Sequence, residues 1–287
     1  MQGENKKGAY LALILSMVIF GTIGIFRRQI DLPSETLAFV RGILGSVFLL
    51  LAMRLTGRRF QTAPLRGSLM LLVLTGAMIG FNWILLFEAY NYTTVAVATL
   101  CYYMQPVIVL LISPLLFKEP VTLRKFLCVA AALAGMVLVS GAAGSSSAGT
   151  DPVKGMLLGL GAAALYASVV MLNKKITGVP VYEKTIIQLF SAAAALVPYM
   201  LARGSFRSYA PGTAQVILLL TVGIIHTGLA YALYFGAVEK LPVQTAALFS
   251  YIDPVTAVLL SALFLHEPMT PAGIAGAVLI LGALMLA

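Results

Sequence analysis

The sequence has few charged residues: Lys, Arg, Asp and Glu make up 10% of it, whereas a soluble domain carries about a quarter. So small a polar fraction cannot coat a water-exposed surface, which excludes a soluble enzyme and a disordered chain. Cysteine is also scarce, and Cys101 and Cys128 both lie in apolar runs as reduced packing residues, which excludes a secreted disulfide scaffold. Apolar side chains dominate instead, at 60% of 287 residues with a mean hydropathy of +0.98, and they predict a polytopic membrane protein.

Apolar stretches long enough to cross a bilayer recur along the chain, since a helix spanning about 30 Å of hydrocarbon needs about 20 mostly apolar residues. The ten stretches lie near residues 8–26, 34–53, 67–88, 95–116, 123–140, 154–172, 184–202, 213–236, 242–264 and 271–287. The first lacks a small-residue cleavage site, so we expect a retained span and not a signal peptide. The short alternating segments of a β-barrel are absent from the sequence, which favours an all-helical membrane protein.

The basic residues are distributed unevenly over the expected loops. With the N-terminus placed in the cytosol, 13 of the 19 Lys and Arg residues fall on the cytosolic side and five on the outer side, while Arg41 lies within a span. This bias follows the positive-inside rule and predicts that both termini are cytosolic. It also accounts for the net charge of +9 without a nucleic-acid partner.

The second half of the chain repeats the first. Gly80–Thr122 aligns without a gap on Gly228–Thr270, with 16 identities in 43 positions. We therefore expect residues 1–142 and 153–287 to form two five-helix units, joined by a Gly/Ser-rich linker at 143–152. Because five is odd, the second unit enters the membrane from the opposite face. Inverted repeats of this kind build transporters with a substrate site near the membrane midplane.

Two corresponding segments carry a resemblance to a known family. One reads Leu100-Cys-Tyr-Tyr-Met-Gln-Pro106-Val107 and continues to Phe117-Lys-Glu119-Pro120; the other reads Leu248-Phe-Ser-Tyr-Ile-Asp-Pro254-Val255 and continues to Leu265-His-Glu267-Pro268. With its ten expected spans, the chain resembles the EamA-type branch of the drug/metabolite transporter superfamily. The resemblance implies a central cavity lined mainly by the first, third, fourth, sixth, eighth and ninth spans. It also implies a gradient-driven, often proton-driven, exporter of amino acids, other metabolites or drugs in the bacterial inner membrane.

Two titratable residues are predicted near the membrane midplane, where a charge costs about 3 kcal/mol or more and usually faces a cavity or a partner. Asp253 directly precedes Pro254 in the ninth span, and we predict that it carries a proton or contacts a cation. Its repeat counterpart, Gln105, cannot titrate. His226 in the eighth span has an imidazole whose ordinary pKa of about 6.5 suits proton exchange. A paired structural carboxylate and a packed structural histidine are the alternatives.

Two further charged residues lie nearer the outer face. Glu88, toward the outer end of the third span, either attracts cationic groups at the outer mouth or reaches interfacial water. Arg41, in the outer third of the second span, is expected to snorkel to the headgroups in a mainly structural role.

Aromatic residues inside the spans predict the walls of a substrate pocket. Trp83 aligns with Tyr231, and Tyr103 aligns with Tyr251, so two aromatic pairs approach the centre from opposite halves. The residues predicted to bind substrate are Trp83, Tyr102, Tyr103, Gln105, Tyr166, Tyr231 and Tyr251. Such a pocket suits an amphipathic or aromatic metabolite, or an organic cation with Asp253 as counter-charge. Aromatic helix packing, which also applies to Tyr234, is the structural alternative.

The sequence therefore predicts a secondary active transporter that exports a small amphipathic metabolite by alternating access, with possible proton coupling and without cofactor or metal. An uncoupled facilitator or exchanger of the same substrates is the alternative. An intramembrane enzyme is remote, because His266-Glu267 is followed by Pro268-Met269-Thr270 and not by a second metal-binding histidine. A channel is disfavoured because the rings of like groups that line a channel usually come from symmetric subunits. An ATP-driven pump is excluded because this sequence lacks the phosphate-binding loop that such a pump needs.

Overall fold

The computed structural model describes residues 2–30, 32–65, 67–93, 95–118, 120–140, 151–205, 212–264 and 271–286. Helices joined by turns and loops make up these ranges, which confirms the all-helical prediction. Residues 143–150 of the expected linker lie outside the described part, as do Glu119, His266, Glu267 and Pro268 of the paired segments.

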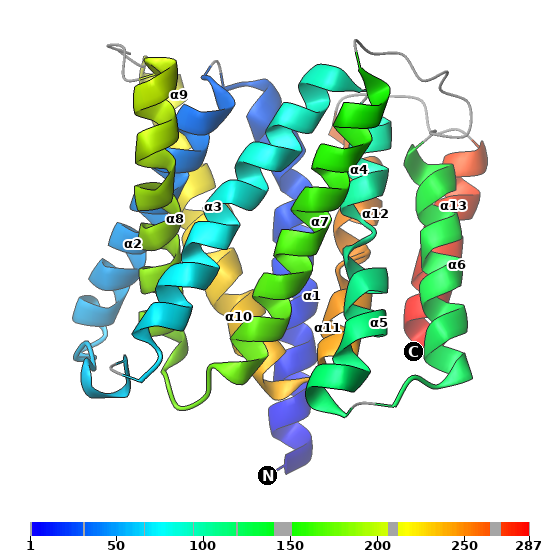
Figure 1. Cartoon of the computed structure of the whole chain (residues 1–287), viewed down its shortest axis with the longest axis horizontal. Helices are drawn as coiled ribbons and strands as arrows, with labels where there is room; N and C mark the ends of the chain where they lie inside the picture. The colour runs from blue at the N-terminus through cyan, green and yellow to red at the C-terminus, as the bar shows by residue number, and fades with distance from the viewer. Residues whose placement is uncertain are drawn as a thin grey trace.

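The helices follow the order of the expected spans and run side by side along one direction (Figure 1). The first half contains α1 (Gln2–Arg28), α2 (Ser34–Leu55), the short turn η1 (Ala63–Leu65), α3 (Leu69–Tyr92), α4 (Val95–Tyr102), α5 (Gln105–Phe117) and α6 (Leu123–Ser140). The second half contains α7 (Pro152–Lys175), α8 (Val181–Arg203), α9 (Thr213–Gly223), the π-helical turn η2 (Ile224–Leu229), α10 (Ala230–Lys240), α11 (Val243–Phe249), α12 (Ile252–Phe264) and α13 (Pro271–Leu286).

Seven helical segments of the described chain are long and apolar enough to cross a membrane. They are Lys6–Ile23, Glu35–Leu55, Leu69–Ala89, Leu100–Phe117, Pro152–Lys175, Val181–Arg203 and Thr213–Lys240, and α13 is a shorter apolar helix. Large apolar side chains such as Leu51, Phe81 and Phe190 are exposed on the outside of the bundle. An apolar exterior of this extent is stable against lipid and not against water, so the protein is a multi-pass membrane protein. The total of ten spans stays a prediction.

Two of the expected spans are each broken into two helices. α4 ends at Tyr102 and α5 begins at Gln105, while α11 ends at Phe249 and α12 begins at Ile252. Each second piece carries a proline, Pro106 or Pro254, in its first turn. Proline has no N–H and its ring crowds the preceding turn. It is therefore favourable in the first turn of a helix but prevents the preceding helix from continuing through it. The breaks place Tyr103 and Tyr251 in non-helical turns inside the bundle.

Small residues allow the helices to approach closely. A Cβ atom built on Gly76 of α3 would lie 2.5 Å from a backbone oxygen of α8, and one on Gly135 of α6 would lie 2.7 Å from a backbone oxygen of α13. Gly21 brings α1 against α12 in the same way, with 2.6 Å from its built Cβ to the Asp253 carbonyl oxygen. α6 and α13 pack along each other at one edge of the bundle (Figure 1). Apart from Glu88, the residues predicted for the site lie among the remaining helices, in the interior of the bundle.

Candidate functional site

Two aromatic pairs lie where the two halves of the chain meet. The indole Nε1 of Trp83 donates a hydrogen bond of 3.2 Å to the Tyr231 hydroxyl, and the two ring centroids lie 6.2 Å apart. Tyr103 and Tyr251 stack at 6.0 Å, and the Tyr251 hydroxyl donates to the Tyr103 carbonyl oxygen at 3.0 Å. Within each pair the residues are 148 positions apart, which is the shift of the sequence repeat. The structure thus brings together residues that the repeat alignment equates.

A continuous series of ring contacts joins the two pairs. Tyr102 contacts the adjacent tyrosine of the second pair at 5.6 Å and stacks on Tyr166 at 5.8 Å. Tyr166 stacks on Tyr234 at 6.1 Å, and Phe20 lies 6.4 Å from Tyr234 and 5.2 Å from Tyr231. We call this set the aromatic row, and its members are Phe20, Trp83, Tyr102, Tyr103, Tyr166, Tyr231, Tyr234 and Tyr251. The row contains every aromatic residue predicted for the site.

Asp253 and Gln105 occupy equivalent positions just after the two helix breaks. The Asp253 carboxyl accepts a hydrogen bond from the Tyr103 side chain. Protein atoms surround Asp253, yet part of its surface stays accessible. Gln105 is 2% exposed, and among the described atoms its Nε2 has no hydrogen-bond partner. Buried polar atoms without partners are uncommon, so this amide retains the capacity to bind a ligand.

Arg41 points into the bundle, and the expectation that it snorkels to the headgroups is wrong. The residue is 6% exposed, its Nε donates to Thr227 Oγ1 at 3.0 Å, and its guanidinium carbon lies 4.6 Å from the centroid of the Trp83 ring. The π-helical turn η2 presents Thr227 to α2, and Trp83 comes from α3. A cation over the face of an indole is attracted by the ring quadrupole, which holds the side chain inward.

His226 also lies on η2, but its contacts differ from those of an open proton carrier. Its Nε2 lies 2.6 Å from Thr22 Oγ1, its Nδ1 lies 3.4 Å from the Thr221 carbonyl oxygen, and its ring packs edge-on against Phe26 at 4.8 Å. Both ring nitrogens therefore have partners within the protein. These contacts favour the structural alternative for His226, and Asp253 is left as the better candidate for proton exchange.

Glu88 lies at the far end of the bundle, which is the end where α1 finishes. Its Oε1 accepts hydrogen bonds from Arg203 at 2.9 Å and from the Tyr199 hydroxyl at 2.8 Å, which tie α3 to α8. A hollow of about 210 Å³ opens beside this ion pair. The residues that line it are Glu35, Ile84, Phe87, Glu88, Asn91, Tyr199 and Arg203. Glu88 therefore lies in the wall of a far-end vestibule, apart from the aromatic row.

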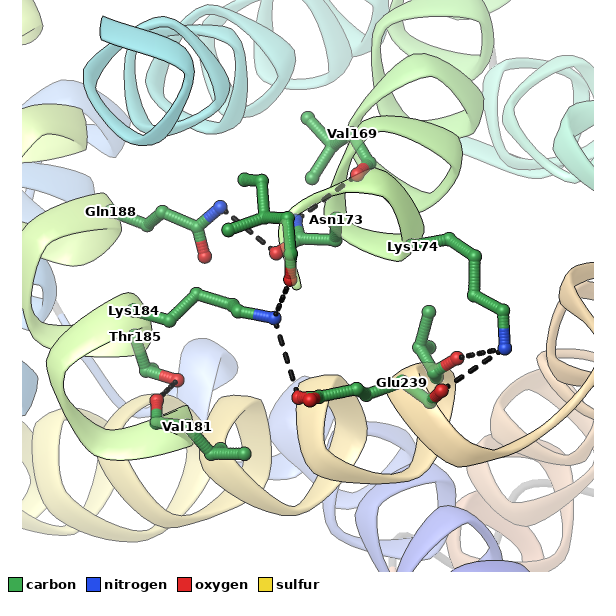
Figure 2. Close-up of polar contacts among 10 residues, drawn as sticks. Val169, Asn173, Lys174, Val181, Lys184, Thr185, Gln188 and Glu239 are labelled. Atoms are coloured by element: carbon green, nitrogen blue, oxygen red, sulfur yellow. Dashed lines mark hydrogen bonds and ion pairs between the residues drawn. The ribbon is translucent and has the colours of Figure 1, made fainter. Parts of the chain in front are cut away.

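A buried polar cluster closes the opposite end, where α1 begins. The Lys184 side chain is 1% exposed, and its Nζ donates to the Ile176 carbonyl oxygen at 2.8 Å and lies 3.4 Å from Glu239 Oε2. Lys174 reaches the other side of Glu239 and donates to backbone carbonyl oxygens where α10 ends (Figure 2). Gln188 Nε2 donates to Asn173 Oδ1 at 3.0 Å, which joins α8 to α7. The ends of α7, α8 and α10 are thus held together by side chains.

Sequence reasoning missed three features of this arrangement. The sequence does not indicate that Phe20 belongs to the site or that Arg41 points inward, because a single phenylalanine or arginine in an apolar run does not reveal which way it faces. Lys184 is one of the 13 basic residues that the charge bias places on the cytosolic side, and nothing in the sequence indicates that it is fully buried. Among the described residues, no group of three or more His, Cys, Asp or Glu side chains is arranged to hold a metal ion.

Comparison with known proteins gives the family. The EamA-like transporter family matches residues 7–141 and again residues 153–287. The chain is 29% identical over 264 residues to the uncharacterized transporter YxxF of Bacillus subtilis, covering 92% of this chain and 84% of that protein. It is also 27% identical to the protein PecM of Dickeya dadantii over 253 residues, covering 87% and 81%.

A solved crystal structure has the same fold, with a TM-score of 0.85 at 20% sequence identity, covering 98% of this chain and 96% of the other. The family match covers nearly the whole chain in two parts, one for each half of the sequence. This chain therefore belongs to the EamA-like transporter family.

Proposed function

We propose that this chain is a secondary transporter that moves a small amphipathic molecule across the bacterial inner membrane by alternating access. The observation that carries the proposal is the contact between repeat equivalents, Trp83 with Tyr231 and Tyr103 with Tyr251. Residues related by a two-fold axis touch each other only near that axis. The separate family matches to the two halves support two five-helix units of opposite orientation. Exchange of their conformations opens a central site first to one side and then to the other.

The two ends of the bundle differ in a way that fits such a cycle. Lys184, Glu239 and Lys174 hold α7, α8 and α10 together at the N-terminal end, which the charge bias assigns to the cytosol. The far end carries the vestibule beside Glu88 and Arg203. Opening of the central site to the cytosolic side requires separation of the first set of contacts, and closure of the outer side requires collapse of the vestibule.

The aromatic row supports the substrate class that we propose. Stacked tyrosines offer flat, largely apolar walls, while Gln105 and Asp253 add polar groups from the two helix breaks. This combination suits a molecule with an apolar body and one or two polar ends, such as an amino acid, an organic cation or a drug. The direction of transport that we propose is export.

We assign proton exchange to Asp253, because it is a surrounded carboxyl that remains partly accessible and contacts the aromatic row through Tyr103. The test uses proteoliposomes loaded with a pH-sensitive dye, to which pools of amino acids, organic cations and amphipathic drugs are added. A pool that moves protons with the wild type should move none with Asp253→Asn, although Asp253→Asn should still exchange labelled substrate at raised concentration, with lowered affinity. His226→Gln is the matched control and should retain proton movement.

Two other results would change the assignment. Proton movement that survives Asp253→Asn would remove this residue from the coupling step. Saturable counterflow of a labelled compound without proton movement in the wild type would establish the uncoupled exchanger instead. Uptake that neither saturates nor shows counterflow would contradict a carrier altogether.

A further inference from the structure

Arg41 is a buried cation without a carboxylate partner. Its side chain uses one donor, Nε, on Thr227, and among the described residues no Asp or Glu oxygen lies within ion-pair distance of its guanidinium group. A guanidinium has five N–H donors, so four of them remain on Nη1 and Nη2. Burial of a charge is costly unless the charge is paired, and the Trp83 ring supplies only a modest compensation. The protein thus keeps an unneutralised positive charge beside the aromatic row.

Trp83 is correspondingly unsuited to hold a cationic ligand. The Arg41 guanidinium already lies over its ring at 4.6 Å, and the indole N–H is taken by the Tyr231 hydroxyl. A second cation at this indole would meet the charge of Arg41 in a surrounding of low dielectric, where repulsion is strong. This end of the aromatic row favours an anionic group.

The other charge of the site, Asp253 of α12, lies near the same aromatic residues. A Cβ built on Gly21 would lie 2.6 Å from the Asp253 carbonyl oxygen, and the adjacent Phe20 contacts Tyr231 at 5.2 Å. A cationic site and an acidic site therefore lie near one set of aromatic side chains. An amphipathic zwitterion matches this pair of charges, with its anionic group toward Arg41, its cationic group toward Asp253 and its apolar body packed on the aromatic row.

We propose that Arg41 binds an anionic group, such as a carboxylate, of the transported molecule, and that the site takes a zwitterion. This inference rests on the proposed transport function and names the substrate class of that site. A cationic group at Asp253 would compete there with a proton, so zwitterion and proton would bind alternately. A purely cationic substrate is excluded by the proposal.

The test uses the single tryptophan of the chain, Trp83, whose fluorescence reports on its contact with Arg41 without any need for transport. Purified protein in lipid nanodiscs is titrated with three matched compounds: L-phenylalanine, phenethylamine, which lacks the carboxylate, and 3-phenylpropionate, which lacks the amine. The wild type should bind phenylalanine most tightly. Arg41→Gln should weaken phenylalanine and 3-phenylpropionate by about 30-fold or more, and should not weaken phenethylamine.

Two variants keep the proposal falsifiable where Arg41→Gln folds poorly. Arg41→Lys retains the charge and should retain a preference for carboxylates. Thr227→Val removes the hydroxyl that accepts from Nε and donates to the Val222 carbonyl oxygen, but it leaves the guanidinium charge in place. It should therefore lower thermal stability but leave the carboxylate-to-amine affinity ratio within about twofold. A merely structural role of Arg41 predicts the same ratio in all variants, which would overturn the proposal.

The remaining outcomes separate this proposal from the transport function. A wild-type protein that responds to neither carboxylate, or that prefers phenethylamine, overturns the role of Arg41. If such a protein still shows counterflow of labelled phenethylamine in proteoliposomes, the transporter assignment stands without it. Carboxylate binding that depends on Arg41, without counterflow, supports the site and contradicts transport.

Discussion

Replacement of Lys184 by methionine tests how firmly the N-terminal end of the bundle is closed. Methionine fills the space of the aliphatic stem, so the change removes the ammonium group and little packing. The ammonium donates to the Ile176 carbonyl oxygen at 2.8 Å and lies 3.4 Å from the Glu239 carboxylate, whose side chain is 33% exposed. Since the carboxylate can be hydrated after the change, most of the loss comes from the Ile176 carbonyl. A hydrogen bond from a charged donor contributes about 1.5–3 kcal/mol, so we expect a loss of about 2 kcal/mol.

The reverse change, Glu239→Gln, should cost more. It leaves the Lys184 ammonium, whose side chain is 1% exposed, without a counter-charge. Removal of one partner from a buried pair costs about 3–5 kcal/mol, and the partial exposure of Glu239 places the expected value near the lower figure, at about 3 kcal/mol. The double variant should be no less stable than Glu239→Gln alone, because it buries no unpaired charge.

Thermal unfolding in detergent, followed by Trp83 fluorescence, measures these differences. At about 2–4 °C per kcal/mol, Lys184→Met should lower Tm by about 4–8 °C and Glu239→Gln by about 6–12 °C. Lys175→Met is the control, because Lys175 is an exposed lysine at the C-terminal end of α7, at the same end of the bundle as Lys184. It should shift Tm by less than about 2 °C. A Lys184→Met variant as stable as the control, or a Glu239→Gln variant more stable than Lys184→Met, would refute the argument from burial.

Two further substitutions test the packing of the centre by the same measurement. Gly21→Ala should destabilise by about 1–3 kcal/mol, because its Cβ would lie 2.6 Å from the Asp253 carbonyl oxygen, whereas Gly8→Ala on the same helix meets nothing within 4 Å. Equal Tm values for the two alanine variants would contradict the close approach of α1 and α12. Tyr251→Phe removes the 3.0 Å hydrogen bond to the Tyr103 carbonyl and should cost about 1 kcal/mol. An unchanged Tm would show that this bond contributes nothing to stability.

The sequence predicts the fold well where a physical constraint acts on each residue type. Length and apolarity of the runs predict helices, and Pro106 and Pro254 indicate where two of them break. The repeat alignment predicts which residues correspond, and the contact of Trp83 with Tyr231 follows if both lie near a common axis. The exact helix ends, such as Lys240 for α10, are set by local capping and loop geometry, which apolar periodicity does not encode.

The site is less predictable, because a helix that is apolar all round gives no indication of which face points inward. Arg41 was expected at the headgroups, yet the Trp83 ring and Thr227 on another element hold it inside. The ordinary pKa of histidine makes proton exchange at His226 one of two sequence-based interpretations, and the sequence does not show that the hydroxyl of Thr22, about 200 residues away, lies 2.6 Å from one ring nitrogen. Such partners are known only once the tertiary packing is known.

The contact of Trp83 with Tyr231 has a consequence for how far the two halves can be alike. An indole has one donor and no acceptor, so two tryptophans facing each other at this position could form no hydrogen bond. The bond exists because one half has tryptophan where the other has tyrosine. Tyr103 and Tyr251 are the same residue type, and between them the Tyr251 hydroxyl donates to the Tyr103 carbonyl oxygen, so the two tyrosines take different parts in their contact. A single hydrogen bond has a direction, so each of these two contacts breaks the equivalence of the two halves, and a ligand bound there meets two chemically distinct sides.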